Sequence, residues 1–407
     1  MCAIKSTYNN SSAPKNINND AGSDAARLLY FFRLMSKHNL NLSMEDPAKT
    51  AVAVHLSYVN DKAPGITRKR KGKGWVYIMP DGNICKDDLT LLRIRNLVLP
   101  PAWDKVWICL KANGHLQATG IDSKNRKQYK YHPDWEGARK ETKFNKMILF
   151  GELLPALRKQ IEKDLRLPQL CEKKVIALVI NLMDKTALRI GNSSYEKMYG
   201  SYGITTLKDK HVKIKGSKLK IRFIGKKGIL QDLEVTNTRL AGLVKKCRDI
   251  PGQELFQYYN NEGEIKSVES GMINQYIQEV TGMNFSAKDF RTWKASVYAV
   301  RTLMDLCEEG NTSTQKQLIF CFDFVSQKLG NSKAICKKYY IHPKIISFFE
   351  KGDFQKKTEL KIKPVHNNLN YYRTGELNLL HLLGSVIDKT QKRTMKSLVN
   401  KRNVAAA

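Results

Sequence analysis

The sequence predicts an α+β protein with a small β-rich N-terminal domain, followed by a mainly α-helical domain that contains one small antiparallel sheet. Three observations lead to this fold class. Short apolar runs separated by turn residues fill roughly residues 50–135, which is typical of short strands. Apolar residues recur with helical spacing after residue 142. Between the helical segments, residues 211–236 switch to alternation. The length of 407 residues fits two or three domains.

The N-terminal part begins with an Asn/Ser-rich stretch, residues 1–23, that we predict to be disordered. Residues 25–35 have the composition of a short helix with a wide apolar surface. The strand expected from Gly74 runs into a Pro-Asp-Gly turn that ends at Gly82. Two more strands are expected at residues 106–110 and 114–120, with a turn between them.

The C-terminal part is predicted to be helical at residues 144–167, 175–190, 270–306 and 314–329. In the alternating segment, Leu219, Ile221 and Phe223 alternate with cationic residues, so one face of the sheet should pack and the other should form a row of cations. An apolar stretch at 377–387 and a basic tail at 389–402 follow. We find no internal repeat.

The composition points to a polyanionic partner. The chain has 70 Lys and Arg against 38 Asp and Glu, a formal net charge of +32. A surplus of this size favours nucleic acid first and an anionic membrane surface second. No stretch approaches the ~18 consecutive apolar residues of a membrane span, and the N-terminus lacks an apolar signal-peptide core, which predicts an unsecreted protein. The eight cysteines never form Cys-x-x-Cys, which argues against a structural zinc site and fits free thiols in a reducing compartment.

Two segments place a cation where core packing does not require one. The apolar stripe of the predicted helix 175–190 runs on to Arg189, at its C-terminal end just before Gly191. An arginine there either complements the helix dipole or serves a functional site. Lys226 stands at the tip of the expected hairpin, where it is either a solvated turn lysine or a side chain presented on a rigid frame.

Two later segments add a cation pair and a tyrosine pair. Lys288 and Arg291 are three residues apart and share a helix face if that turn is helical, as a phosphate-facing pair or an exposed ion-pair patch. A Gly-Asn helix stop leads to Tyr339 and Tyr340, and Pro343 disfavours helix at the residue before it. Adjacent tyrosines can be core residues, or one of them can be a nucleophile.

Order and spacing connect these segments. Together they resemble the catalytic set of type IB DNA topoisomerases, in the small poxvirus-type and bacterial branch: Arg189, Lys226, Lys288-x-x-Arg291, Gly330-Asn331 and Tyr340. Segments outside this set look like the same branch, namely residues 64–75, 100–103, 115–120, 126–133 and 207–211. The resemblance covers roughly residues 50–345. Each motif is weak alone, and their shared order makes the resemblance specific.

The resemblance implies a transesterification. Tyr340 would attack a DNA phosphodiester, form a 3′-phosphotyrosyl link and release a 5′-hydroxyl, and the reverse step would reseal the strand without ATP, metal or cofactor. Arg189 and Arg291 would hold the nonbridging oxygens, and Lys226 would be the general acid. Tyr340 is chosen over Tyr339 because the family places its nucleophile nine residues after the position matched by Asn331.

One position departs from the poxvirus pattern. Poxvirus members carry histidine where this chain has Asn331, while some bacterial and large-virus relatives carry asparagine. An amide can donate a hydrogen bond to a nonbridging oxygen but cannot act as an acid or base. The expected role of Asn331 is therefore hydrogen bonding.

DNA contacts are implied in two segments and beside the second arginine. The first segment combines cations, an amide and aromatics, which suit phosphates and base edges. The resemblance places Gln128, Tyr129 and Tyr131 toward the major groove. Tyrosines on a strand face are also ordinary core material. Lys288 replaces the histidine that tyrosine recombinases usually hold three residues before this arginine. The candidate DNA-binding residues are Arg126, Lys127, Gln128, Tyr129, Tyr131, Asn192, Tyr195 and Lys288.

These expectations divide the chain into an N-terminal extension at 1–45, disordered or a short helix, a β-rich DNA-binding domain at 46–140, a helical catalytic domain at 141–350 and a C-terminal extension with a basic tail at 351–407. The expected partner is double-stranded DNA, held by a monomer that acts as a clamp, with no membrane partner. We expect an intracellular, DNA-associated protein, in a bacterial nucleoid or cytoplasm or in a viral setting.

Two other functions agree with part of this pattern. A site-specific tyrosine recombinase shares the nucleophile and the arginines, but the Lys288-x-x-Arg291 pair and the N-terminal segments argue against it. A non-enzymatic architectural DNA-binding protein would use the charge alone. A covalent protein–DNA adduct distinguishes the enzymes from such a binder.

Overall fold

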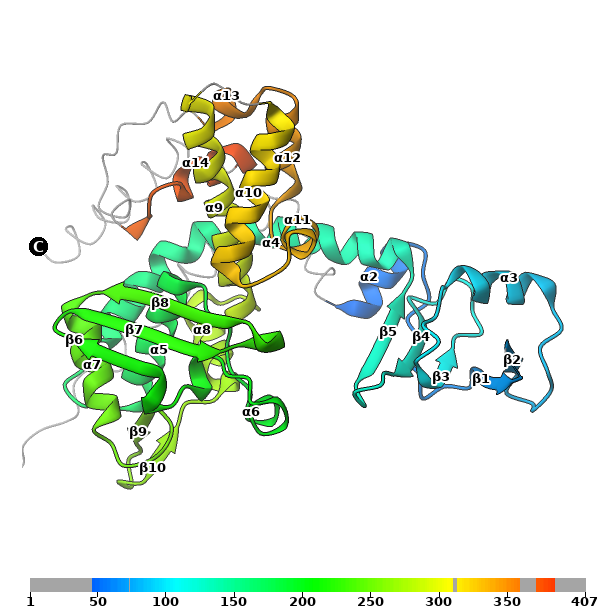
Figure 1. Cartoon of the computed structure of the whole chain (residues 1–407), viewed down its shortest axis with the longest axis horizontal. Helices are drawn as coiled ribbons and strands as arrows, with labels where there is room; N and C mark the ends of the chain where they lie inside the picture. Colours follow the sequence, from blue (N-terminus) through cyan, green and yellow to red (C-terminus); the bar gives the residue numbers. More distant parts are fainter. Residues whose placement is uncertain (1–45, 73, 310–312, 359–370, 385–407) are drawn as a thin grey trace, which may run out of the picture. The chain divides into compact units, whose positions relative to one another are not determined.

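The computed structural model describes residues 46–72, 74–309, 313–358 and 371–384, and the chain divides into two compact units, Met1–Ala138 and Arg139–Ala407 (Figure 1). The helix predicted at 25–35 and the basic tail at 389–402 lie outside the described residues. Within these ranges, no helix is both long and apolar enough to cross a membrane.

The first unit is built on a five-stranded antiparallel sheet in the order β2-β1-β3-β4-β5. Its buried core joins Ile94 of a helix to strand residues such as Ile66 and Ile108. The strands expected near residues 74, 106 and 114 are present. The elements are α2 (Pro47–Ala53), β1 (Ile66–Lys71), β2 (Gly74–Ile78), α3 (Asp88–Asn96), β3 (Asp104–Ile108), β4 (Leu116–Ile121) and β5 (Lys127–Tyr131).

Several distinctive residues of this unit serve its packing. Arg68 is buried against Trp75, with its Cζ 4.0 Å from the ring centroid, and donates hydrogen bonds to the carbonyls of Pro100 (3.0 Å) and Trp103 (2.7 Å). A Cβ at Gly120 would lie 2.7 Å from the Trp103 ring, so only glycine fits there. Through these contacts, the Pro-Pro-Ala-Trp segment at 100–103 packs against the sheet.

The second unit is mainly helical. Its longest helices are α4 (Pro133–Asp164), which begins in the first unit, and α9 (Ala287–Glu309), which packs against several other helices. The remaining elements are α5 (Glu172–Thr186), α6 (Ser193–Tyr199), η2 (Ile204–Thr206), η3 (Asp209–His211), β6 (Val212–Lys215), β7 (Lys218–Ile224), η4 (Lys226–Gly228), β8 (Leu230–Thr236), α7 (Thr238–Arg248), β9 (Gln257–Tyr259), β10 (Ile265–Ser267), α8 (Ser270–Thr281), α10 (Thr314–Leu329), α11 (Lys333–Tyr339), α12 (Pro343–Glu350), α13 (Phe354–Thr358) and α14 (Glu376–Leu383).

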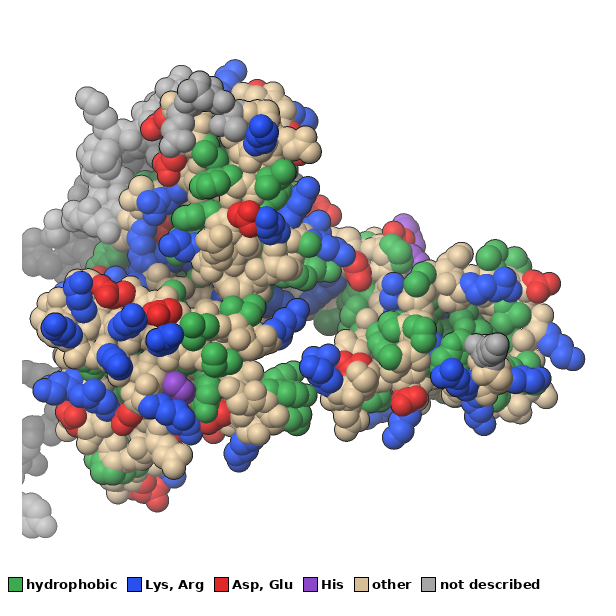
Figure 2. All heavy atoms as spheres, in the orientation of Figure 1, with side chains coloured by type: hydrophobic (Ala, Val, Ile, Leu, Met, Phe, Trp, Pro, Cys, Tyr) green, Lys and Arg blue, Asp and Glu red, His purple; other side chains and the backbone are tan. Residues whose placement is uncertain are grey.

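The predicted alternating segment forms the antiparallel sheet β6-β7-β8, one face of which packs on α5 and α7 (Figure 1). Leu219, Ile221 and Phe223 are buried on that face, as the alternation predicts. The outer face is not a simple row of cations, because the register sets β7 lysines beside β8 carboxylates. Ion pairs join Lys218 to Glu234 and Lys220 to Asp232, and blue and red side chains mix over this sheet in Figure 2.

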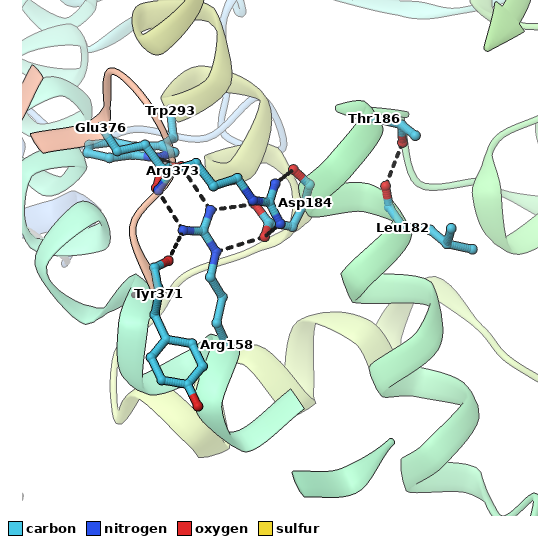
Figure 3. Close-up of polar contacts among 8 residues, drawn as sticks. All are labelled: Arg158, Leu182, Asp184, Thr186, Trp293, Tyr371, Arg373 and Glu376. Carbon is cyan, nitrogen blue, oxygen red and sulfur yellow. Dashed lines mark hydrogen bonds and ion pairs between the residues drawn. The ribbon is translucent and has the colours of Figure 1, made fainter. Parts of the chain in front are cut away.

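A buried ion cluster joins distant parts of the second unit (Figure 3). The guanidinium of Arg158 in α4 donates to both oxygens of Asp184 in α5 and to both oxygens of Glu376 in α14, at 2.7–2.9 Å. Arg373 also pairs with Asp184, and the indole of Trp293 donates to Glu376 (3.1 Å). Because Asp184 and Glu376 are at most 1% exposed, this cluster fastens residues 371–383 to the core of the unit. The arrangement as a whole confirms the predicted α+β fold class.

Candidate active site

Arg189 lies just beyond the end of α5. The sequence places it on the last turn of that helix, which is wrong, because Ala187 adopts a left-handed conformation (φ 57°) and ends the helix at Thr186. The Arg189 side chain is half-buried, and its Nη2 donates to the carbonyl of Gly330 (3.2 Å) and to Oδ1 of Asn331. Burial lowers the pKa of Arg189, and the nearby Tyr340 opposes that shift.

Arg291 lies in the first turns of α9 and is 5% exposed. Its Nη1 donates to the carbonyl of Ala187, and its Nη2 donates to the carbonyl of Leu329 (2.8 Å). Its Cζ is 5.7 Å from the centroid of the Tyr340 ring. Burial, and then the charge of Arg189, lowers the pKa of Arg291, so two cations are held close together in a partly dehydrated site.

Asn331 follows the end of α10, where Gly330 adopts a left-handed conformation (φ 59°). The Asn331 amide oxygen accepts from Arg189, while its Nδ2 is buried and has no hydrogen-bond partner among the described residues. Nε of Arg291 is also buried without a hydrogen-bond partner, while the Tyr340 side chain lies within hydrogen-bonding reach of the same guanidinium. Buried donors without partners are uncommon, so these two N–H groups are available to an acceptor that enters the site.

The two tyrosines at the end of α11 have different surroundings. Tyr340 is half-buried, and its ring lies near both Arg291 and Lys143, whose Nζ is 5.1 Å from the ring centroid. The Ser296 hydroxyl donates to the Tyr340 carbonyl (3.2 Å), which fixes the backbone at this residue. Tyr339 is 41% exposed and carries Lys338 over its ring. The structure therefore brings Tyr340, Arg291, Arg189 and Asn331 together.

Lys226 is exposed at the tip of the β7–β8 hairpin, in a turn where Lys227 is left-handed (φ 66°). Lys226, Arg189 and Gln231 line one small hollow. A Cβ at Gly330 would lie 2.7 Å from Nε2 of Gln231, so the hairpin approaches the turn that carries Asn331. Lys226 is thus on the edge of the cluster rather than within it.

Lys288 and Arg291 are both in α9, as the spacing predicts, but they differ in exposure. Lys288 is exposed and Arg291 is buried. Lys288 lies close enough to Lys143 to disfavour its charged form. The pair therefore consists of one buried cation and one exposed cation.

The candidate DNA contacts of the first unit lie on the edge strand β5. Tyr129 and Tyr131 stack with centroids 6.0 Å apart, and Lys127 lies over the Tyr129 ring. Gln128 points to the opposite face of the strand, where its Nε2 donates to Asp122 (2.8 Å).

Carboxylates accompany the cations of this strand. Arg126 pairs with Asp122 (2.7 Å), and its hydrogen bond lowers the pKa of Asp122 to about 2. Lys127 pairs with Asp61 and lowers the pKa of that carboxyl. Both cations are therefore positioned by acidic neighbours.

Asn192 and Tyr195 begin the short helix α6, which buries none of its residues. The Asn192 amide oxygen caps this helix by accepting from the backbone N–H groups of Ser194 (2.9 Å) and Tyr195 (3.2 Å). Tyr195 is 52% exposed and lies near the Tyr199 ring. The helix thus presents aromatic side chains to solvent shortly after Arg189.

Sequence reasoning missed Lys143, Ser296 and Gln231. Each contacts the cluster only through tertiary packing, and no motif or spacing in the sequence marks them. Among the described residues, no three His, Cys, Asp or Glu side chains gather in a way that could hold a metal ion.

Two family models match this chain. The one described as eukaryotic DNA topoisomerase I, catalytic core, matches residues 132–365, and the one described as bacterial DNA topoisomerase IB, N-terminal domain, matches residues 74–122. The chain is 32% identical over 286 residues to DNA topoisomerase 1B of Acanthamoeba polyphaga mimivirus, a match that covers 68% of this chain and 85% of that protein. It is 25% identical over 227 residues to DNA topoisomerase 1 of Mycosarcoma maydis, covering 51% of this chain and 21% of that protein.

A solved structure with a weaker likeness is the XerH site-specific recombinase bound to palindromic difH substrate. The TM-score is 0.33 and the identity 14%, over 49% of this chain and 50% of that chain, which is too low to carry an argument. The catalytic-core model, in contrast, spans more than half of the chain, and the viral enzyme is matched over most of its length. The chain therefore belongs to the type IB DNA topoisomerases.

Proposed function

We propose that this type IB topoisomerase relaxes supercoiled duplex DNA by cleaving one strand transiently through a 3′-phosphotyrosyl intermediate and resealing it, without ATP or a metal ion. The observation that carries the proposal is the convergence of Tyr340, Arg291, Arg189 and Asn331 from separate segments of the chain. The hydrogen-bond partners of the two arginines are neutral carbonyls and an amide. Their positive charge therefore remains available to an anionic ligand.

In the cleavage step, the phenol of Tyr340 gives its proton to solvent, its oxygen attacks the scissile phosphorus, and the bond from phosphorus to the 5′ oxygen breaks. The transition state carries extra negative charge on the nonbridging oxygens. Arg189 and Arg291 suit that charge because a guanidinium stays protonated and can hold two oxygens. Removing one such donor typically lowers the rate by about 10²–10³-fold. Asn331 contributes a hydrogen bond from its unpartnered Nδ2.

The leaving 5′ oxygen needs a proton, and Lys226 is the group we assign to deliver it. Its exposed position on a hairpin tip, beside Arg189 and Gln231, lets it reach a phosphodiester bound at the arginines. The proton moves from Nζ to the 5′ oxygen as the bond to phosphorus breaks. Religation reverses the step, and the covalent intermediate conserves the bond energy.

The proposed partner is double-stranded DNA, gripped by a monomer that acts as a clamp, in a bacterial nucleoid or cytoplasm or a viral setting. The net charge of +32 supports a polyanionic partner. The stacked pair Tyr129 and Tyr131 with Lys127 offers aromatic and cationic groups to backbone and bases. We assign Tyr195 and Lys288, both exposed, to DNA contacts in the second unit.

The test is plasmid relaxation in EDTA without nucleotide, with substrates of both supercoil signs, together with adduct trapping on a nicked duplex. Wild-type protein should relax both substrates and form the adduct. Tyr340→Phe should abolish both activities and retain duplex binding, while the matched variant Tyr339→Phe should keep them. Full activity in Tyr340→Phe, or loss only in Tyr339→Phe, would overturn the assignment.

A further inference from the structure

Lys143 of α4 reaches the segment that carries the proposed nucleophile. Its Nζ donates a hydrogen bond to the carbonyl of Tyr339 and lies 5.1 Å from the centroid of the Tyr340 ring. Arg291 is also near this ring, at 5.7 Å. A lysine from one helix and an arginine from another therefore both lie close to the ring of Tyr340.

The position is unfavourable for an ammonium group. Burial is the largest cause that lowers the pKa of Lys143, the charges of Lys288 and Lys140 add to it, Asp289 opposes it, and the resulting pKa is about 8. A charge kept at such a position without a tight carboxylate partner contributes little to folding. Groups that are held at a cost to stability concentrate at functional sites.

We propose that Lys143 is a positioning residue for the catalytic tyrosine, and that its ammonium group holds the Tyr339 carbonyl and the face of the Tyr340 ring so that the phenol is presented to the scissile phosphate. This inference rests on the proposed role of Tyr340. Lys143 acts through the tyrosine and not on the DNA.

The physical basis is a contact that strengthens during attack. A cation near an aromatic face is attracted by the negative charge of the ring. As the phenol of Tyr340 loses its proton and attacks, the ring gains negative charge, so the attraction from Lys143 increases. An interaction that is stronger in the transition state than in the ground state raises the rate of the chemical step.

The chain contains a matched control one turn further along α4. Nζ of Lys146 donates to the carbonyl of Asn284 and lies 5.1 Å from the centroid of the Phe285 ring. The chemistry is the same, but the ring belongs to a phenylalanine. Lys146→Met therefore measures what the loss of such a contact does away from the tyrosine.

The experiment measures the single-turnover rate of adduct formation with excess enzyme on a nicked duplex. We expect Lys143→Met to slow adduct formation by about tenfold, with duplex affinity unchanged within about twofold. Its melting temperature should equal or exceed that of wild type, because a desolvated charge near Lys288 is removed. Lys143→Arg should keep most of the rate, and Lys146→Met should cleave at the wild-type rate.

The pH profile adds a readout that a purely structural role would not change. The ratio of wild-type to Lys143→Met rates should decline as pH rises above about 8, because Lys143 of the wild type then loses its charge. Bound phosphates shift this decline to higher pH. Lys143→Arg does not titrate in that range and should keep its rate. The charged and titratable groups that face Lys143 are Lys140 from α4, Lys288 and Asp289 from α9, and Tyr340 after α11. Arg291 lies near the same tyrosine ring.

Several outcomes would overturn the inference. One is a wild-type cleavage rate in Lys143→Met, and another is equal slowing in Lys146→Met. A slowed Lys143→Met whose melting temperature also falls, with no recovery in Lys143→Arg, would indicate a structural role instead. The proposed function fails separately, if Tyr340→Phe still forms the adduct.

Discussion

Replacing Glu376 by glutamine tests whether the buried ion cluster holds the second unit together. Glu376 is fully buried and accepts hydrogen bonds from Arg158 (2.7 and 2.8 Å), Trp293 (3.1 Å) and the backbone N–H of Arg373 (2.8 Å). Glutamine keeps the shape, but it removes the charge and turns one acceptor into a donor that faces a guanidinium. Removing one partner of a buried pair typically costs about 3–5 kcal/mol. At about 2–4 °C per kcal/mol for a unit of this size, the melting temperature should fall by roughly 6–20 °C.

The assay is thermal unfolding followed by circular dichroism, and Glu264→Gln is the matched control. Glu264 also pairs with a cation, Lys266 at 2.8 Å, but both side chains are about half exposed. An exposed pair contributes little, so the control should leave the melting temperature almost unchanged. The reasoning is refuted if Glu376→Gln shifts the transition no more than Glu264→Gln does, because the burial of the cluster would then have no energetic consequence.

Three further outcomes can be measured on the same unit. Lys226→Ala should slow cleavage by about 10²–10⁴-fold. A substrate with a 5′-bridging sulfur should largely restore the rate of this variant, because a thiolate needs no proton to leave. If the sulfur substrate does not restore the rate, Lys226 is not the acid. Asn192→Ala should lower the free energy of opening of α6 by about 1 kcal/mol in hydrogen exchange, because the helix loses its N-cap; unchanged protection would contradict the cap. Burial pushes the pKa of Asp184 upward, but Arg158, Arg373 and Lys294 together outweigh burial and lower it overall. The stabilisation from Asp184 is therefore present above about pH 4 and lost as pH falls; the acid side of the stability curve should be shallower in Asp184→Asn, and an equal slope would contradict this.

The alternating and periodic segments were predictable because their pattern is local. The β7 strand alternates over Leu219, Ile221 and Phe223, and the structure buries all three. The end of α5 was not predictable, because Ala187 is a helix-forming residue that adopts a left-handed conformation here. Its N–H donates to the Met183 carbonyl and closes the helix, so Arg189 follows a turn rather than a helical face.

The residue set of the candidate site came from motif order, whereas its surroundings depend on tertiary contacts. Lys143 meets Tyr340 only because α4 passes α11, and Glu376 meets Arg158 across more than 200 residues of chain. Gln128 illustrates the reverse case, since the resemblance predicts a DNA contact for it. Strand alternation turns it toward Asp122, on the face opposite Tyr129. A motif gives the residue type, and the fold decides its direction.

The two arginines of the candidate site are held by the C-terminal ends of two helices. α5 ends at left-handed Ala187 and α10 ends at left-handed Gly330. Carbonyls that remain free there accept from Arg291 and Arg189. A helix C-terminus carries a partial negative charge, so it offsets part of the desolvation of a guanidinium without neutralising it.

The contrast with Arg158 shows why this matters for function. Arg158 is as buried as Arg291, but two full carboxylates surround it and raise its pKa. Its charge is compensated inside the protein, so it can stabilise the fold but cannot attract a phosphate. Arg291 keeps an uncompensated charge and an unpartnered Nε. The partners of an arginine, rather than its burial, therefore distinguish a structural role from the proposed phosphate-binding one in this unit.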